Sequence, residues 1–443
     1  MDNHAVRSFL SATAATSIAL MLGTLTACSG GDTGASPTKT IVIGADLPLT
    51  GVEGAAGLST LNGVRFFVHS HPTLDGFNIT IDARDDPFSA ARDTARGVSN
   101  VQALIAQAQV LAMIGPFDAS VARAQIPIAN RAHLALVSPG TSSRCLTKVP
   151  FLPSALNPAR TEISCKMAGL PSPSELRPAG INNFFRLSTT DDLQGPAAAD
   201  YASKQLHLQR AAVLTDGEAY GQALADGFTA TFNRLGGVVV GRQDLNLTKT
   251  LDAAAFLRGA KNDGAQGVYF GGTSSNHACT LLSQMAGVLG PDAPLLGGDG
   301  IALDPTCIAD AGATATSIYA TVPAAAAERI DSARAVIAAF KAEYGRPGDF
   351  GPYTVAAYDA TAVIYDALDR AIKAAGGKPP ARDSVVAELA ATTAFSGATG
   401  KFGFDPQGDT TLRIVSIFRP VSSDPDAGWT WAATQDYSAA LPY

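Results

Sequence analysis

Short runs of consecutive apolar residues alternate along this chain with longer segments in which apolar residues recur on one helical face. Between residues 110 and 143 the spacing predicts a strand at Val110–Ile114, a helix at Ser120–Arg131 and a second strand at Leu134–Val137. Neither strand alternates apolar with polar positions, which is typical of parallel strands covered by helices on both faces. Strand and helix alternate in this way over most of the chain, which predicts an α/β fold.

The alternation is interrupted once, by a segment at residues 145–181. This segment is rich in Pro, Ser and Gly and has no clear period, so we expect an inserted surface loop. Strand and helix patterns resume at Phe184 and continue to Val322. Two long helical stretches are expected next, at Ala325–Tyr344 and Tyr353–Ala375, and a tail of β character ends the chain. Two α/β halves imply two lobes, and a cleft between lobes is a common place for a small-molecule site.

The turns that follow the strands at 110–114 and 134–137 are rich in Gly, Pro and hydroxyl residues. Ser120 is the expected N-cap of the helix, which would gather free N–H groups and the positive helix end beside its hydroxyl. Because neighbouring parallel strands end at the same sheet edge, the two turns predict a crevice suited to a small anion such as a carboxylate. Turns that only connect strands to helices, without a binding role, are an equally good interpretation.

Composition narrows the classes of function. The chain has 443 residues, 46% of them hydrophobic and 16% charged, which is typical of a globular protein with room for two domains. Its net charge of −7 argues against a nucleic-acid partner or an anionic membrane surface. The six histidines are scattered, so no metal site is expected. No G-x-G-x-x-G follows the first strand, and Gly397–Lys401 is not followed by Ser or Thr, so no cofactor is expected.

The N-terminus predicts export. The apolar segment Phe9–Ala27 ends in Leu25-Thr26-Ala27-Cys28, which resembles a bacterial lipoprotein signal in which Cys28 becomes the lipidated first residue. A plain transmembrane anchor is the alternative. Residues 29–39 then form a flexible tether. Localisation is expected at the outer face of the cytoplasmic membrane or in the periplasm, through the lipid anchor.

Export leaves four cysteines for disulfides, which can pair in three ways. Sequence proximity favours Cys145–Cys165 and Cys279–Cys307. Such bonds suit an oxidising compartment, and free buried thiols are the alternative.

Several segments, taken in order, resemble the type I periplasmic solute-binding proteins, in particular the leucine/isoleucine/valine-binding branch of ABC importer receptors. The segments are Ile41–Gly44, Leu49–Gly51, Ile114–Pro116, Val137–Ser142, Arg186–Gly195, Thr215–Gly221, Gly298–Gly300 and Thr399–Asp405. The resemblance implies two Rossmann-like lobes with parallel sheets, joined by a three-strand hinge. Lobe 1 would comprise residues 40–186 and 323–397, and lobe 2 residues 187–322 and 398–443, after the signal at 1–28.

The resemblance also implies the site residues. The carboxylate of an amino-acid ligand would meet Ser120, the backbone of Gly140, and Ser142, with Thr141 in the same turn. The ligand's ammonium group would meet Asp299, for which a turn aspartate is the alternative.

Two further candidates come from the second lobe. Tyr220 would cover the ligand, unless it simply packs under its turn, and Thr273 is a weaker candidate.

The first turn of the first lobe carries Gly54–Gly57 where many relatives have an aromatic residue. This difference argues against a branched-chain amino acid as the ligand.

The favoured function is therefore an exported, monomeric lipoprotein that binds an amino acid or similar solute and presents it to ABC permease subunits. It would make and break no bond. A ligand-sensing receptor subunit on the same fold is the first alternative. An exported α/β hydrolase is a weaker one, because histidine is scarce near the candidate turns.

Overall fold

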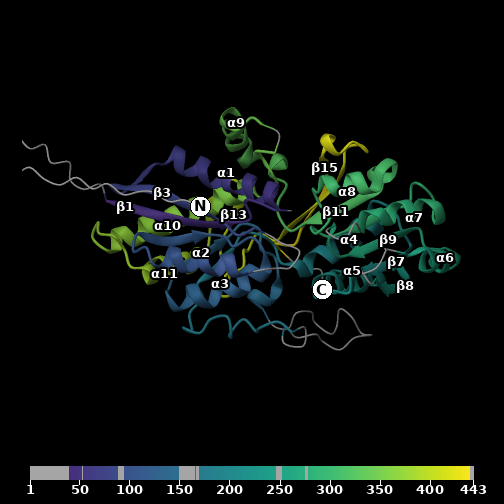
Figure 1. Cartoon of the computed structure of the whole chain (residues 1–443), viewed down its shortest axis with the longest axis horizontal. Coiled ribbons are helices and arrows are strands. Elements are labelled where there is room, and N and C mark those ends of the chain that lie inside the picture. The colour runs from purple at the N-terminus through teal and green to yellow at the C-terminus, as the bar shows by residue number, and fades with distance from the viewer. Residues whose placement is uncertain are drawn as a thin grey trace, which may run out of the picture. The chain divides into compact units, whose positions relative to one another are not determined.

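Two largely parallel sheets organise the chain (Figure 1). The computed structural model describes residues 39–443, except 52, 88–93, 149–164, 166–168, 246–251, 275–277, 347 and 440–443. The expected signal, Cys28 and nearly all of the tether lie outside the described residues. Among the residues described, no helix is both long and apolar enough to cross a bilayer.

The first sheet is built from residues on both sides of the expected loop insertion, with β6 following it. Its strands are β1 (Thr40–Leu47), β2 (Thr73–Leu74), β3 (Phe77–Asp85), β4 (Val110–Ile114), β5 (Ala135–Ser138) and β6 (Phe184–Arg186). They lie in the order β2-β3-β1-β4-β5-β6, and all are parallel except the short edge strand β2. Alternate residues of a strand face opposite sides of the sheet and pack in different cores.

On one side, Ile41 and Ile43 pack with α1 (Gly54–Ser70), α10 (Thr354–Ala374) and α11 (Arg382–Ala390).

The opposite face of the first sheet is covered as well. Met113, Leu136 and Phe184 pack there against α2 (Ala95–Ile105) and α3 (Ala119–Arg131). Burial on both faces explains why these strands read as continuous apolar runs.

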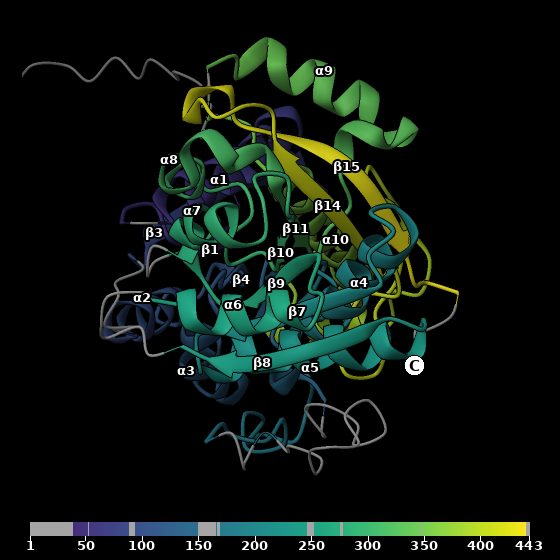
Figure 2. The same ribbon diagram turned by 90° about the vertical axis from the view of Figure 1, so that its right-hand side faces the viewer.

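The second sheet has the same architecture with an antiparallel extension. Its strands are β7 (Arg210–Thr215), β8 (Val238–Asp244), β9 (Gly267–Gly271), β10 (Leu295–Gly297), β11 (Ile318–Val322), β14 (Ile414–Pro420) and β15 (Trp429–Asp436). Their order is β15-β14-β11-β10-β9-β7-β8, with β14 and β15 antiparallel. Figure 2 faces this lobe and shows these two yellow strands continuing the sheet beyond β11.

Helices cover both faces of the second sheet. One face packs against α4 (Gln194–Lys204) and α5 (Ala219–Arg234). The other packs against α6 (Ala254–Asn262), α7 (Leu281–Val288) and α8 (Pro305–Ala311). The α/β prediction with two parallel-sheet lobes is confirmed.

Three chain crossings connect the lobes, and Thr189 in the first crossing binds the other two. Its N–H donates to the Pro323 carbonyl oxygen at 2.7 Å and its hydroxyl donates to the Ile414 carbonyl oxygen at 2.8 Å. The third crossing follows the hairpin of β12 (Phe395–Gly397) and β13 (Gly400–Phe402). Phe402 and Phe404 pack in the first lobe's core, so this crossing begins later than the expected boundary at residue 397.

Local differences from the sequence predictions have clear physical causes. The helix after β4 begins at Ala119, and its N-cap is Asp118 rather than Ser120. The expected helix at 325–344 is regular only as α9 (Arg334–Glu343), because Ile330 has an extended backbone between two 3-10 turns. The disulfides Cys145–Cys165 and Cys279–Cys307 are both present, as predicted.

Candidate functional site

Asp299 is the centre of a polar cluster at the carboxyl end of β10. The Tyr220 hydroxyl donates to Asp299 Oδ1 at 2.5 Å, and the Gln194 side-chain amide donates to the same oxygen at 2.8 Å. The Asp299 N–H donates back to Gln194 Oε1 at 3.0 Å. Burial raises the pKa of Asp299, and the two side-chain donors oppose this shift by stabilising its charge. The carboxylate is thus held in one orientation by side chains from α4 and α5.

Glycines on both sides of Asp299 make this geometry possible. A Cβ atom at Gly298 would lie 2.7 Å from the Tyr220 hydroxyl oxygen, and one at Gly300 would lie 2.5 Å from the Gly272 carbonyl oxygen. Thr273 packs against the same turn, because a Cβ at Gly300 would be 3.1 Å from its Cα. The structure therefore brings Tyr220, Thr273 and Asp299 together.

Asp191, in the first crossing, links this cluster to the first lobe. The Gln194 amide also donates to Asp191 Oδ1 at 3.3 Å, and the Asp191 N–H donates to the Ser142 carbonyl oxygen at 3.0 Å. Burial and the negative charge of Asp299 raise the pKa of Asp191 to about 7, against the opposing effects of a hydrogen bond with the Ser142 side chain and of the positive charge of Arg186. Ser142 is therefore the predicted first-lobe residue that joins the cluster around Asp299.

Asp118 occupies the N-terminus of α3. Its carboxylate accepts hydrogen bonds from the N–H of Ser120 at 2.6 Å and of Val121 at 3.2 Å, and from the Ser120 hydroxyl. The extended backbone of Asp118 points its side chain back at the helix end. The prediction that Ser120 caps the helix was wrong, and a protein carboxylate takes up the N–H groups expected to receive a ligand anion.

The turn after β5 is also bonded within the protein. The Thr141 N–H donates to the Ser138 hydroxyl at 2.9 Å, and the Thr141 hydroxyl lies 2.6 Å from the Pro116 carbonyl oxygen. Gly140 packs on a ring, since a Cβ there would lie 2.7 Å from Cε2 of Phe117. Sequence reasoning placed Gly140 and Thr141 in the correct turn, and their contact with a ligand stays a prediction.

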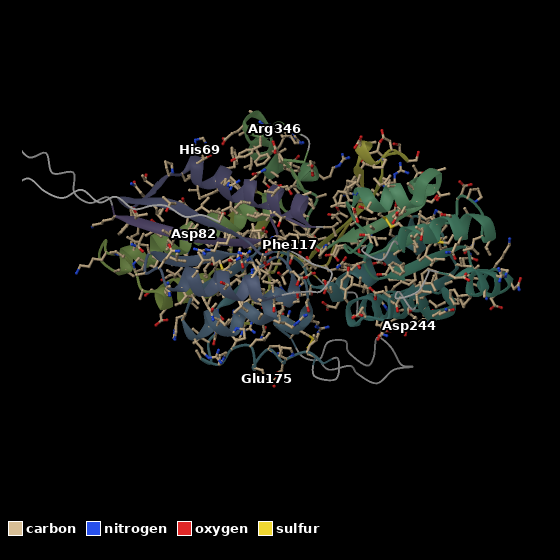
Figure 3. All side chains as sticks on the ribbon, in the orientation of Figure 1. His69, Asp82, Phe117, Glu175, Asp244 and Arg346 are labelled. Carbon is tan, nitrogen blue, oxygen red and sulfur yellow. A yellow bond between two sulfur atoms is a disulfide. The ribbon has the colours of Figure 1, made fainter. Side chains whose placement is uncertain are left out.

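Phe117 lies where the two lobes meet. It packs edge-to-face on Tyr353, with ring centroids 5.1 Å apart, and belongs to a cluster that includes Ala302 and Leu303 of the second lobe. Figure 3 labels Phe117 near the middle of the ribbon. The negative charges of Asp299 and Asp191 help to raise the pKa of Tyr353, although burial is the larger cause. This aromatic pair therefore borders the acids.

Glu53, in the first turn of lobe 1, was missed from the sequence. Its Oε2 atom is buried without a hydrogen-bond partner. Burial, helped by the negative charges of Asp118 and Asp299, raises the pKa of Glu53 to about 8. The sequence offered a signal for each residue that was missed. Glu53 directly precedes the Gly54–Gly57 turn, Asp118 directly precedes its helix, and Gln194 follows the first crossing.

We call the residues that meet here the interlobe site: Glu53, Phe117, Asp118, Ser142, Asp191, Gln194, Tyr220, Asp299 and Tyr353. Within the described ranges, no three histidine, cysteine or acidic side chains are arranged to hold a metal ion. Hydrogen-bond acceptors with negative charge dominate the site. Such an arrangement can bind a polar solute, and it holds no activated nucleophile with a general base.

A sequence profile of the periplasmic binding protein family matches residues 40–425. The chain belongs to this family. It is a solute-binding protein and not an enzyme.

Individual relatives agree with this assignment. The leucine-, isoleucine-, valine-, threonine- and alanine-binding protein of Pseudomonas aeruginosa is 32% identical over 235 residues, which cover 53% of this chain and 59% of that protein. The Leu/Ile/Val-binding protein BraC3 of Rhizobium johnstonii is 25% identical over 86% of this chain and 91% of its own. The crystal structure of the leucine-binding protein LivK of Thermotoga maritima superposes with a TM-score of 0.65 at 24% identity, covering 89% of this chain and 98% of that chain. This last likeness supports the fold of this periplasmic binding protein.

Proposed function

We propose that this periplasmic binding protein captures a small polar ligand, an amino acid or similar amine, between its lobes and presents it to an ABC importer. The observation that carries the proposal is the Asp299 carboxylate, oriented by Tyr220 and Gln194 and bonded through Gln194 to Asp191. A carboxylate held in this way is a ready acceptor for a ligand ammonium group. The relatives named above bind leucine and similar amino acids, as their names state, and they support the proposal of an amino-acid-like ligand.

Ligand binding would act on the lobes through the three crossings. The two expected lobes, 40–186 with 323–397 and 187–322 with 398–443, would move about the hinge, with their last boundary shifted from residue 397 to beyond Phe404. A ligand that contacts both lobes binds the form with adjacent lobes better and shifts the population towards it. A permease can distinguish that form from the ligand-free one, so binding alone is sufficient for delivery.

The first test is a thermal-shift screen of the purified chain against amino acids, amides, amines and aromatic acids. A true ligand at 100 times its dissociation constant adds roughly 2.7 kcal/mol to the free energy of unfolding. Stabilisation without turnover is the expected result. If no small solute raises the melting temperature, or if an ester is hydrolysed, the solute-binding proposal is overturned.

Export as a monomeric lipoprotein completes the proposal. Cys28 would carry the lipid, and residues 29–39 would tether the lobes to the membrane. Cys28→Ala is expected to move the protein from the membrane fraction to the soluble fraction. Wild-type protein found only in the soluble fraction would contradict the anchor and leave the binding proposal intact.

A further inference from the structure

We infer that the interlobe site selects small organic cations with a net positive charge, such as diamines and diamino acids. The inference rests on the proposed solute-binding function and names its ligand class. It differs from a neutral amino acid, for which a site needs an anion-binding half as well as an acid.

Two of the residues expected to bind a ligand carboxylate, Ser120 and Thr141, are already bonded within the protein. Asp118 takes the N–H groups of Ser120 and Val121 and the Ser120 hydroxyl. The Thr141 N–H and hydroxyl donate to Ser138 and Pro116. A ligand carboxylate at the α3 N-terminus would displace Asp118 and would meet its charge, which is unfavourable for two anions at close range.

Among the described residues, in contrast, Glu53, Asp118 and Asp299 form no ion pair with a basic side chain, and the positive charge of Arg186 acts on Asp191. Both charges that act on Glu53 are negative, and one of its carboxylate oxygens is buried without a donor. Two arginines near the first crossing are bonded to other acids, Arg186 to Asp409 at 2.7 Å and Arg144 to Asp192 at 3.1 Å. A ligand ammonium group between Glu53 and Asp299 would supply the missing positive charge.

A second observation concerns Asp86, an acid on which the negative charge of Asp118 acts. Asp86, at the end of β3, is 4% exposed, and neither of its carboxylate oxygens has a hydrogen-bond partner. The charges of Asp118 and Asp46 act on this residue. Asp86 therefore adds to the negative potential at the α3 N-terminus, where a carboxylate-binding protein would need a positive one.

The aromatic pair favours an organic cation over a bare ion. Phe117 and Tyr353 border the acids and offer ring faces and edges to an alkyl chain. Ammonium groups gain from such faces through cation–π attraction, and the methylene groups between two ammonium groups gain from burial.

Charge also explains how such a ligand would act on the lobes. Glu53 and Asp118 belong to the first lobe and Asp299 to the second, so like charges face each other across the interlobe site. A ligand cation placed between them replaces repulsion by attraction and favours the form with adjacent lobes. A neutral ligand leaves the repulsion in place.

Calorimetric titration of the purified chain at pH 8 tests the inference with matched ligands. Lysine and norleucine differ only in the terminal ammonium group, and lysine and cadaverine differ only in the carboxylate. We expect norleucine to bind at least tenfold more weakly than lysine, and cadaverine to bind at least as tightly as lysine. Calcium chloride is titrated in parallel.

The variant Glu53→Gln keeps the size of the side chain and removes its charge. We expect at least a tenfold loss of cadaverine affinity with no loss of thermal stability, because the substitution removes a buried unpaired carboxylate. Asp292→Asn, an exposed site with the same change of charge, is the control and should leave the affinity unchanged.

The outcomes separate the inference from the function on which it rests. Tighter binding of norleucine or of an aromatic acid than of cadaverine would overturn the cation class and keep the solute-binding function. Binding of calcium but not of cadaverine would overturn the organic cation, and so would unchanged cadaverine affinity in Glu53→Gln. No binding of any solute would overturn both proposals.

Discussion

Two clusters of buried charge in this protein are built in opposite ways. At the third crossing, Arg186 is fully buried and its guanidinium donates to Asp409 at 2.7 Å, to the Ser143 carbonyl at 2.7 Å and to the Thr147 hydroxyl at 2.5 Å. Lys148 lies 2.9 Å from the second oxygen of Asp409. These positive neighbours hold the pKa of Asp409 at about 2, although burial alone would raise it.

Among the described residues, the acids of the interlobe site form no ion pair of this kind. There the pKa of Glu53 rises to about 8 and that of Asp191 to about 7, because burial and neighbouring carboxylates both disfavour the charged form. The Arg186–Asp409 cluster has its charges paired within the protein, whereas the acids of the interlobe site do not. A ligand that supplied a positive charge to the interlobe site would therefore gain binding energy there. The comparison shows that Arg186 and Asp409 hold the crossings together, whereas we propose that the acids of the interlobe site are arranged for a ligand.

Disrupting the Arg186–Asp409 cluster should have the largest effect, which is a loss of stability. Asp409→Asn leaves the buried Arg186 without its counter-charge and is expected to lower the free energy of unfolding by about 3–5 kcal/mol at pH 7. Urea denaturation measures this loss. The control Asp331→Asn removes a surface ion pair with Arg334 and should change stability by less than about 0.5 kcal/mol. A change as small in Asp409→Asn would contradict a structural role for the cluster.

The second effect concerns ligand affinity. Asp299→Asn keeps the shape of the side chain and removes the charge that Tyr220 and Gln194 orient. We expect the affinity for an ammonium-bearing ligand to fall by about 1.5–3 kcal/mol, the range of a charge-assisted hydrogen bond. Calorimetry measures this change, and an unchanged affinity would remove Asp299 from the site.

A smaller effect of opposite sign is expected for Asp86, whose pKa is raised to about 9 by burial and by the charge of Asp46. Because the unfolded chain ionises near the ordinary value of 3.8, stability falls as the pH rises from that value towards 9. Asp86→Asn abolishes this loss and should stabilise the protein by at least about 1.4 kcal/mol at pH 8, the equivalent of one pKa unit.

Thermal melts at two pH values measure the effect of Asp86→Asn. The gain over wild type should shrink when both proteins are compared at pH 4.5. A variant that is less stable than wild type at pH 8 would show that the Asp86 carboxylate is paired.

Sequence patterns predicted the fold well because each strand and each amphipathic helix carries its own signal. The strand at Val110–Ile114 and both disulfides are as predicted, since periodicity and short cysteine spacing are local properties. The helix α11 gave no such signal, and the helix expected at 325–344 is broken before α9 by one extended residue, Ile330.

The site could be predicted only in part. Asp299 and Tyr220 sit in turns that are recognisable one at a time, and the structure joins them by a hydrogen bond. Which groups are already occupied depends in part on distant partners. The Asp118 cap on α3 is local and could have been predicted, whereas only the assembled lobes bring Glu53 within range of Asp299.

The most direct test of the unpaired acids is the pH dependence of cadaverine affinity, because Glu53 must be ionised to bind a cation. With a pKa of about 8 and only Asp118 and Asp299 acting on it, Glu53 is mostly protonated at pH 6.5 and mostly charged at pH 8.5. Cadaverine keeps both its charges in this range, since alkylammonium groups titrate near pH 10.4. Calorimetry should therefore show affinity rising by up to about tenfold per pH unit below pH 8 in wild type and staying flat in Glu53→Gln. An affinity that is independent of pH in wild type, or that falls as the pH rises, would contradict the account.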